Sequence, residues 1–254
     1  MIQIKRLIPN LLTAGNLVGG ILSIIFSITG KIEWAPYCIF ISALFDFLDG
    51  FVARLLKVQS ELGKQLDSLA DMVTFGVAPG VMVMIMLSSW NSDLNQYDFL
   101  SYEHNTELMG FGFIIPIFAL FRLAKFNLDT RQTSSFIGLP TPAMTLFFAP
   151  IPLLVLSGNE SGVIWQETLV SVFTNPTFLI SSTLIMSIMM VVELPLFALK
   201  FNGFKWKGNE LRFIFLILST GLFATLFFWS LPIIIILYLF LSIINNLIHK
   251  TNEI

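Results

Sequence analysis

The stretch DFLDGFVARLLKVQSELGKQLDSLAD covers residues 46–71 and contains four aspartates in a chain that carries little charge. Apolar segments lie on both sides of it. Ionisable side chains within membrane segments are costly and tend to mark functional sites. The arrangement of these four aspartates therefore decides how the rest of the sequence is interpreted.

The composition indicates a protein that crosses a membrane several times. Of the 254 residues, 56% are hydrophobic and 12% are charged, and the mean hydropathy is +0.83. A soluble domain carries about 25% charged residues. The single cysteine, Cys38, excludes an intramolecular disulfide. The basic N-terminus followed by a long apolar run predicts an uncleaved first span rather than a signal peptide.

The predicted fold class is all-α, a polytopic transmembrane helix bundle forming one domain over residues 1–254. A spanning helix needs about 20 apolar residues. The fifth predicted span is expected to be irregular because it is short and rich in proline, and a tight turn at 229–232 is expected before the last. The eight predicted spans cover approximately residues 9–29, 34–56, 65–88, 108–128, 139–157, 176–198, 210–228 and 231–248.

The basic residues predict the orientation, because Lys and Arg concentrate in cytoplasmic loops. With a cytoplasmic N-terminus and eight spans, all of the 14 Lys and Arg residues except Lys31 lie on the cytoplasmic side. The outer loop 89–107 has acidic residues but no Lys or Arg. Both termini and the connection within residues 46–71 are therefore predicted to be cytoplasmic, in the inner or plasma membrane.

Helical periodicity gathers the aspartates on two facing surfaces. One face of the second span carries Asp46, Asp49, Gly50 and Ala53. One face at the start of the third span carries Gly63, Asp67 and Asp71. The connection between these helices is short, so they are predicted to be antiparallel neighbours whose acidic faces meet near the cytoplasmic boundary.

Such a cluster is typical of a divalent-cation site, because four facing carboxylates repel one another and a cation relieves the repulsion. Oxygen ligands favour Mg²⁺ or Mn²⁺, and two such ions about 4 Å apart suit phosphoryl transfer. Gly50 and Ala53 leave room for a polar ligand, and Arg54 supplies a cation for phosphate. Two alternatives are solvated acids paired with Arg54, Lys57 and Lys64, and an ion or proton pathway that would include Glu193.

The eight defined positions read D-x-x-D-G-x-x-A-R, then eight residues, then G-x-x-x-D-x-x-x-D. This pattern resembles in full the signature of the CDP-alcohol phosphotransferases. Members of that family are membrane proteins with six core helices, often dimeric. They displace CMP from a CDP-linked lipid or alcohol, using a hydroxyl nucleophile and divalent metal. The resemblance implies a core over residues 1–200 and two additional spans over 201–254.

Further stretches are similar to the bacterial phosphatidylserine synthases within this family. They are PNLLTAGN at 9–16, SLADMVTFGVAP at 68–79, FRLAKFN at 121–127 and FIGLP at 136–140. The resemblance covers residues 1–150 well, although Lys125 stands where the family usually has arginine. It implies CDP-diacylglycerol and L-serine as substrates, phosphatidylserine and CMP as products, a membrane lipid environment, a possible homodimer and no nucleic acid.

The resemblance also implies roles for individual residues. The expected metal ligands are Asp46, Asp49, Asp67 and Asp71, and Asp71 is also the expected general base. The expected contacts of the CDP-lipid are Gly50, Ala53, Arg54, Ser60, Gly63, Asn10 and Thr13. For Asn10 and Thr13, helix capping beside Pro9 is the alternative.

Basic residues near the fourth span are the candidates for binding the acceptor. Arg122 and Lys125 are expected to hold the serine carboxylate, because an arginine fork fits a carboxylate, and Arg131 is a weaker candidate. Anchoring to lipid headgroups is the alternative role. The runner-up function is the same chemistry with glycerol 3-phosphate or an inositol compound as acceptor. A cation or proton transporter is a more distant alternative.

Overall fold

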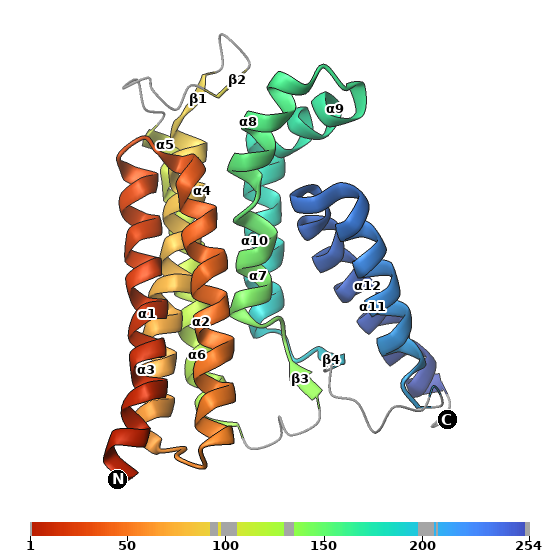
Figure 1. Ribbon diagram of the computed structural model, residues 1–254. Coiled ribbons are helices and arrows are strands. Elements are labelled where there is room, and N and C mark those ends of the chain that lie inside the picture. The colour runs from red at the N-terminus through yellow and green to blue at the C-terminus, as the bar shows by residue number, and fades with distance from the viewer. Residues whose placement is uncertain are drawn as a thin grey trace.

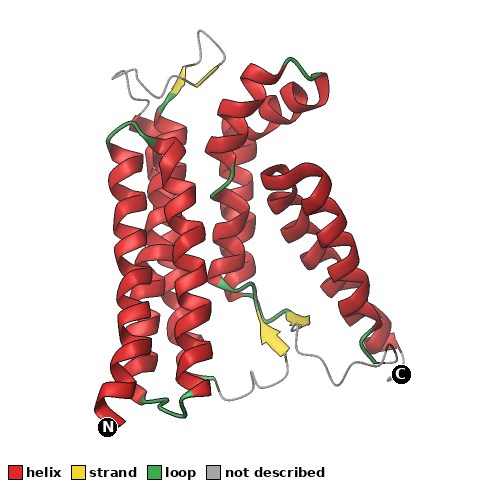
Figure 2. Cartoon of the chain, viewed as in Figure 1, coloured by secondary structure: helices red, strands yellow, loops and turns green. Residues whose placement is uncertain are grey.

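The computed structural model describes residues 2–91, 96–97, 106–129, 135–197, 206 and 208–251. Over these residues the chain is a bundle of helices with two short strand pairs (Figure 1; Figure 2). The predicted all-α class is therefore confirmed. The first helix begins, and the last helix ends, at the end of the bundle that also carries the connection between the second and third helices (Figure 1).

The helices and strands follow in this order. The first half contains α1 (Ile2–Ile28), η1 (Ile32–Trp34), α2 (Ala35–Leu55), α3 (Glu61–Asp71), η2 (Met72–Val77), α4 (Ala78–Ser88), β1 (Trp90–Asn91), β2 (Gln96–Tyr97), α5 (Thr106–Met109), η3 (Gly110–Phe113) and α6 (Ile114–Leu128). The second half contains β3 (Ser135–Ile137), α7 (Thr141–Phe148), α8 (Ile151–Ser161), α9 (Ile164–Phe173), α10 (Pro176–Val191), β4 (Pro195–Phe197), α11 (Glu210–Leu226), η4 (Phe227–Trp229) and α12 (Ser230–Thr251). Both strand pairs, β1–β2 and β3–β4, are antiparallel.

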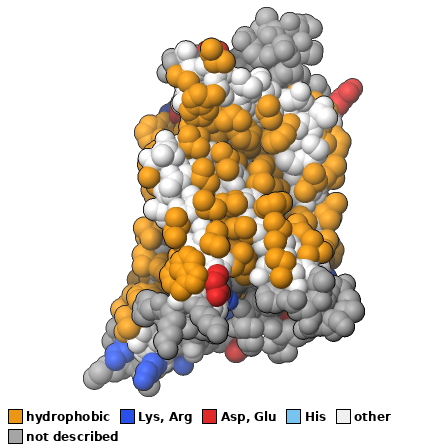
Figure 3. All heavy atoms as spheres, turned by 90° about the vertical axis from the view of Figure 1, so that its right-hand side faces the viewer, with side chains coloured by type: hydrophobic (Ala, Val, Ile, Leu, Met, Phe, Trp, Pro, Cys, Tyr) orange, Lys and Arg blue, Asp and Glu red, His pale blue; other side chains and the backbone are white. Residues whose placement is uncertain are grey.

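Several of these helices are candidate membrane spans, as expected of an integral membrane protein. Five described stretches are long and apolar enough to cross a membrane: Lys5–Ile28, Glu61–Ser88, Glu107–Leu128, Thr141–Gly158 and Glu210–Ile248. The α9–α10 pair, bent by 66°, makes a sixth if it is counted as one span. Figure 3 shows hydrophobic side chains over most of the height of one face. Large exposed apolar surfaces mark contact with a membrane or with another protein.

The structure corrects two predicted boundaries and contains one helix that was not predicted. The sixth predicted span does not reach residue 198, because α10 ends at Val191 and residues 195–197 form β4. Pro195 has no N–H for a helical hydrogen bond.

The additional helix α9 precedes α10, and Asn175 caps the start of α10 by accepting a hydrogen bond from the Thr177 N–H at 2.8 Å. The turn before the last helix lies at 227–229 rather than 229–232.

The expected irregularity of the fifth span is confirmed. It is divided into α7 and α8, with Pro150 at the N-cap of α8 and Pro152 in its first turn. Proline fixes its own backbone and is favoured at the first helical positions. A new helix therefore starts where the α7 hydrogen-bond pattern stops.

The C-terminal helices α11 and α12 form a hairpin beside the main bundle (Figure 1). Helix α12 packs against α7 and β4. The Tyr238 hydroxyl donates to the Phe197 carbonyl at 3.0 Å, and the Asn246 side-chain amide donates to the Pro195 carbonyl at 2.6 Å. Both acceptors belong to β4, so the hairpin braces the β3–β4 ribbon.

Candidate active site

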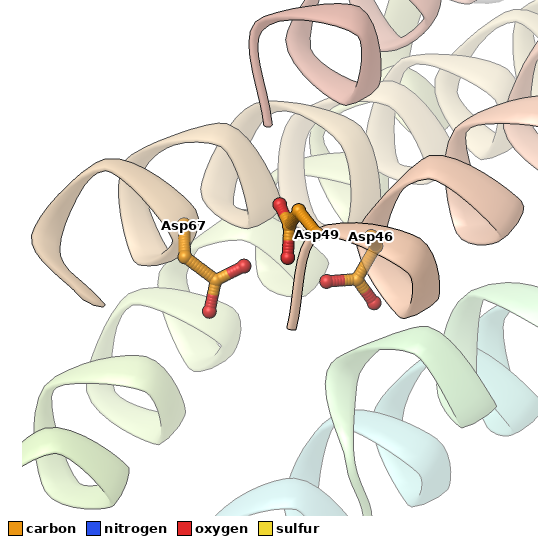
Figure 4. Close-up of side chains that lie close together, drawn as sticks. All are labelled: Asp46, Asp49 and Asp67. Atoms are coloured by element: carbon orange, nitrogen blue, oxygen red, sulfur yellow. The ribbon is translucent and has the colours of Figure 1, made fainter. Parts of the chain in front are cut away.

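Three carboxylates meet where α2 faces α3. Asp46 and Asp49 come from the last turns of α2, and Asp67 comes from α3 (Figure 4). One oxygen from each of the three lies within 4.8 Å of the others. The short connection 56–60 between the helices makes this approach possible. The prediction that two acidic helix faces meet is therefore confirmed.

Asp71 lies one turn further along α3 and is nearly buried, with 8% of its surface exposed. It is the last residue of α3, directly before the π-helical segment η2. Single π-turns inside helices are frequent at functional sites. The Asn16 side-chain amide donates to Asp71 Oδ1 at 3.0 Å. One carboxylate oxygen of Asp71 is therefore fixed by a donor from α1.

Helix α1 also holds Asp49, which is 5% exposed. The Thr13 hydroxyl donates to Asp49 Oδ2 at 2.5 Å and lies 3.0 Å from the Pro9 carbonyl oxygen. The capping alternative for Asn10 and Thr13 is wrong, because α1 begins at Ile2 and continues through Pro9. Thr13 therefore sits inside a helix and faces the acids.

Close packing of α1 explains how these contacts arise. A Cβ on Gly20 would lie 2.8 Å from Thr74 Cα, and a Cβ on Gly19 would lie 3.2 Å from the Cys38 carbonyl oxygen. Small residues let helix backbones approach closely in membranes. The Asn16 carbonyl accepts from the Ser42 hydroxyl at 3.1 Å and the Thr74 hydroxyl at 3.0 Å. Glycine packing and these buried hydrogen bonds fix α1 against α2 and η2.

A pocket of about 520 Å³ opens beside the acids, between α1, α2 and α3. We call it the wide pocket. Its lining contains all seven residues predicted to contact a CDP-lipid: Asn10, Thr13, Gly50, Ala53, Arg54, Ser60 and Gly63. It also contains Asp49, Asp67 and Lys64. The structure thus brings this predicted set together at one surface, with carboxylates and cations on its walls.

Ser60 and Gly63 have a structural role as well. Ser60 is the N-cap of α3, and its hydroxyl accepts from the Gly63 N–H at 3.1 Å. An N-cap hydroxyl satisfies one of the free N–H groups at a helix start. Lys64 donates to the Asn127 carbonyl at 3.0 Å, and the Asn127 amide donates to the Ser68 hydroxyl at 2.9 Å. These contacts tie the start of α3 to the end of α6.

A second pocket of about 410 Å³ contains all four aspartates, and we call it the acid pocket. It shares Asp49, Gly50, Arg54, Asp67 and Phe126 with the wide pocket. Arg122 and the residues Pro140, Thr141 and Pro142 complete its far wall. The two pockets therefore meet at the carboxylates and form one polar surface.

The two predicted acceptor residues lie beyond the acids, on α6. Arg122 is 4% exposed and donates to two backbone carbonyls, from Nε to Leu139 at 3.2 Å and from Nη2 to Gly138 at 3.3 Å. These bonds use two of the five N–H groups of the guanidinium. Lys125 lines a third pocket together with Arg122. Arg131 lies outside the described residues.

Asn16 holds Asp71 but was not among the predicted site residues. Thr13, Asn16 and Gly20 are spaced three and four residues apart, so they share one helical face. That spacing was available in the PNLLTAGN segment and its continuation. The spacing could not identify Asp71 as the partner of Asn16, because the two residues lie 55 positions apart in the sequence.

Similarity to known proteins covers the same part of the chain. A CDP-diacylglycerol–serine O-phosphatidyltransferase of Helicobacter pylori strain J99 is 35% identical over 156 residues, 61% of this chain and 59% of that protein. The Bacillus subtilis strain 168 protein of the same name is 34% identical over 150 residues, 59% of this chain and 75% of that protein. An archaetidylserine synthase of Methanothermobacter thermautotrophicus is 34% identical over 138 residues, 53% of each chain.

The chain thus spans 59% of the length of the Helicobacter pylori relative. The model of the CDP-alcohol phosphatidyltransferase family matches residues 6–175, which is more than half of the chain. That match includes the four aspartates and the whole lining of the wide pocket. The chain belongs to the CDP-alcohol phosphatidyltransferase family.

Proposed function

We propose that the protein transfers the phosphatidyl group of CDP-diacylglycerol to the hydroxyl of L-serine, giving phosphatidylserine and CMP. The observation that carries this proposal is the junction of the wide and acid pockets at three carboxylates that lie within 4.8 Å of one another. The printed names of the bacterial relatives support serine as the acceptor.

The carboxylates fit a divalent cation. Asp46, Asp49 and Asp67 offer the oxygen ligands that Mg²⁺ and Mn²⁺ prefer. Asp67 Oδ1 is buried and has no hydrogen-bond partner among the described residues, and a buried polar atom without a partner is costly. Asp46, Asp49, Asp67 and Asp71 would hold one or two ions. A bound ion would neutralise negative charge on the pyrophosphate and on the departing CMP.

The CDP-lipid would occupy the wide pocket. Gly50, Ala53 and Gly63 present no bulky side chain on its walls, so a pyrophosphate can approach the helix backbones. Arg54 lines both the wide and the acid pocket and is exposed, so its guanidinium can bind phosphate oxygens. Asn10 and Ser60 line the wide pocket and supply polar contacts.

The transfer is a displacement at phosphorus. The acceptor hydroxyl oxygen forms a bond to the lipid-side phosphorus while the bond from that phosphorus to the oxygen of CMP breaks. Asp71 takes the hydroxyl proton. Its Oδ1 is held by Asn16, so the proton is accepted at Oδ2. Positioning and charge neutralisation supply most of the acceleration, as in phosphoryl transfer generally.

The proposed topology has eight spans, with the active site on the cytoplasmic side. Eight spans result if the bent α9–α10 pair and α2 each count as a span, and if α11 and α12 count as two spans rather than the single stretch Glu210–Ile248. An even number of crossings agrees with the start of α1 and the end of α12 lying at one end of the bundle (Figure 1). Serine and CMP would then exchange with the cytoplasm.

Purified protein in detergent tests the proposal. CDP-diacylglycerol, Mn²⁺ and isotope-labelled L-serine should yield labelled phosphatidylserine and one equivalent of CMP. CMP release with glycerol 3-phosphate and none with serine would reject the acceptor and keep the reaction class. Absence of CMP release with every alcohol tested would reject the enzyme and favour a transporter. A CDP-archaeol substrate, in parallel, tests the ether lipid that the archaetidylserine synthase relative suggests.

A further inference from the structure

A third pocket, which we call the side pocket, has walls of opposite charge. It measures about 260 Å³ and lies between the end of α6, β3 and the end of α10 with the segment that follows it. Its charged lining residues are Arg122, Lys125, Asp129 and Glu193. Its apolar lining residues are Leu128, Ile137, Met190 and Val191. A water molecule needs about 10–15 Å³ of such space, so the pocket has room for a small polar molecule.

We propose that the side pocket binds a zwitterionic amino-acid acceptor, with the Glu193 carboxylate as the partner of its ammonium group. This inference rests on the proposed function and adds a residue that determines acceptor specificity. Arg122 and Lys125, on α6, offer cations to the acceptor carboxylate. Glu193 offers the opposite charge from a different element.

The position of Glu193 is fixed by the backbone around it. Helix α10 ends at Val191, and β4 begins at Pro195. The Gly138 N–H donates to the Leu194 carbonyl at 2.8 Å, and the Leu194 N–H donates to the Val192 carbonyl at 2.8 Å. Gly138 has φ of +81°, and a Cβ there would lie 2.6 Å from the Met190 carbonyl oxygen. Glycine is therefore required at this close approach.

The same turn connects the side pocket to the acids. Arg122 donates to the carbonyls of Gly138 and Leu139, so the turn that pairs with Leu194 also orients the guanidinium. Arg122 lines both the side pocket and the acid pocket. In this proposal the charged groups of the acceptor stay in the side pocket, and its hydroxyl faces the acid pocket that contains Asp71.

Charge complementarity explains why this pocket would select serine. Serine carries one carboxylate and one ammonium, and each would meet an opposite charge. Glycerol 3-phosphate carries only negative charge, so Arg122 and Lys125 would attract it while Glu193 and Asp129 would repel it. Specificity often depends on such a repulsive element as much as on attraction. Glu193 lies beyond residues 6–175 that the family model matches, whereas the CDP-lipid residues lie within them.

Kinetics of Glu193→Gln test this inference with the full chain in detergent. The KM for L-serine should rise about tenfold, because a hydrogen bond to a charged group is lost, while the KM for CDP-diacylglycerol stays within twofold. The probe 3-hydroxypropionate has the hydroxyl and carboxylate of serine but no ammonium. Its inhibition constant as a competitor of serine should not change. Glu33→Gln in η1 is the matched control and should behave as wild type.

The outcomes separate the two proposals. A wild-type protein that does not transfer to serine rejects the proposed function. An active wild type whose Glu193→Gln variant keeps the serine KM within twofold, or loses affinity for 3-hydroxypropionate equally, rejects only the role of Glu193. If Glu193→Gln is not monodisperse, the same measurements are made on Glu193→Asp. A rise in the serine KM alone supports the role of Glu193. No change, or an equal change in the serine KM and the 3-hydroxypropionate inhibition constant, overturns it.

Discussion

The region matched by the family model and the C-terminal hairpin are both helical and apolar, yet they are held together differently. In the first, Gly19 and Gly20 bring α1 close to its neighbours, and buried polar groups join the helices. In the hairpin, an added Cβ on Gly221 would meet no atom of the other described segments within 4 Å. The Tyr238 ring packs there against Phe197 and Phe215, with centroids 4.9 and 5.7 Å apart.

This difference teaches what a polar site in a membrane protein requires. Carboxylates near the membrane need fixed partners, so their helices must approach closely and supply hydrogen-bond donors. The hairpin packs mainly through apolar and aromatic side chains, a requirement that many sequences satisfy. Matched substitutions in the two regions should therefore have unequal effects on activity.

The largest contrast is expected from changing one acid to its amide in each region. Asp71→Asn should lower turnover by about 10²–10⁴-fold, because a positioned general base contributes that much. Glu210→Gln at the start of α11 should leave turnover within twofold of wild type. Glu210 accepts from the Gly208 N–H and takes no part in the acid pocket. CMP release is the measurement, with size-exclusion profiles as the check of folding.

A second contrast compares two threonines. Thr13→Val removes the hydroxyl that donates to Asp49. Because groups that orient metal ligands contribute about 10–100-fold to activity or metal affinity, turnover should fall by about that factor. The Mn²⁺ concentration that gives the half-maximal rate should rise. Thr225→Val is the control, because the Thr225 hydroxyl bonds the Gly221 carbonyl of its own helix. Equal rates for the two variants would contradict a positioning role for α1.

A third contrast compares two glycines. Gly20→Ala places a Cβ 2.8 Å from Thr74 Cα, which should lower the free energy of unfolding by about 1–3 kcal/mol. Gly221→Ala meets no neighbour in α11, and it should be neutral or stabilise by up to about 1 kcal/mol. Thermal unfolding in detergent measures both. A neutral Gly20→Ala would mean that α1 can move away without cost.

The acidic segment was the most predictable part of the molecule. Helical spacing placed Asp46 and Asp49 opposite Asp67, and the structure brings their oxygens within 4.8 Å. The short connection between α2 and α3 keeps the two helices as neighbours. All seven residues that the family resemblance implied as contacts of the CDP-lipid line one pocket, since they lie on α1, α2 and the start of α3 around that junction.

Other features depended on contacts between distant segments and could not be predicted from hydropathy. The β3–β4 ribbon pairs Phe136 with Leu196, residues 60 positions apart, and it ends α10 earlier than the apolar run suggested. Arg122 stays a predicted contact of the acceptor, and two of its N–H groups also hold the Gly138–Leu139 turn. These hydrogen bonds depend on how α6 packs against the turn at 138–139, which the sequence alone does not give.

The smallest effect is expected where the hairpin meets the ribbon. Tyr238→Phe removes the hydrogen bond to the Phe197 carbonyl but keeps the ring packing, so the free energy of unfolding should fall by about 0.5–1.5 kcal/mol. The KM for CDP-diacylglycerol should not change, because Tyr238 lines neither the wide pocket nor the acid pocket. Thermal unfolding and CMP release measure the two quantities on one preparation. A tenfold loss of turnover at normal stability would overturn the contrast, because the hairpin would then take part in catalysis through the ribbon that holds Arg122.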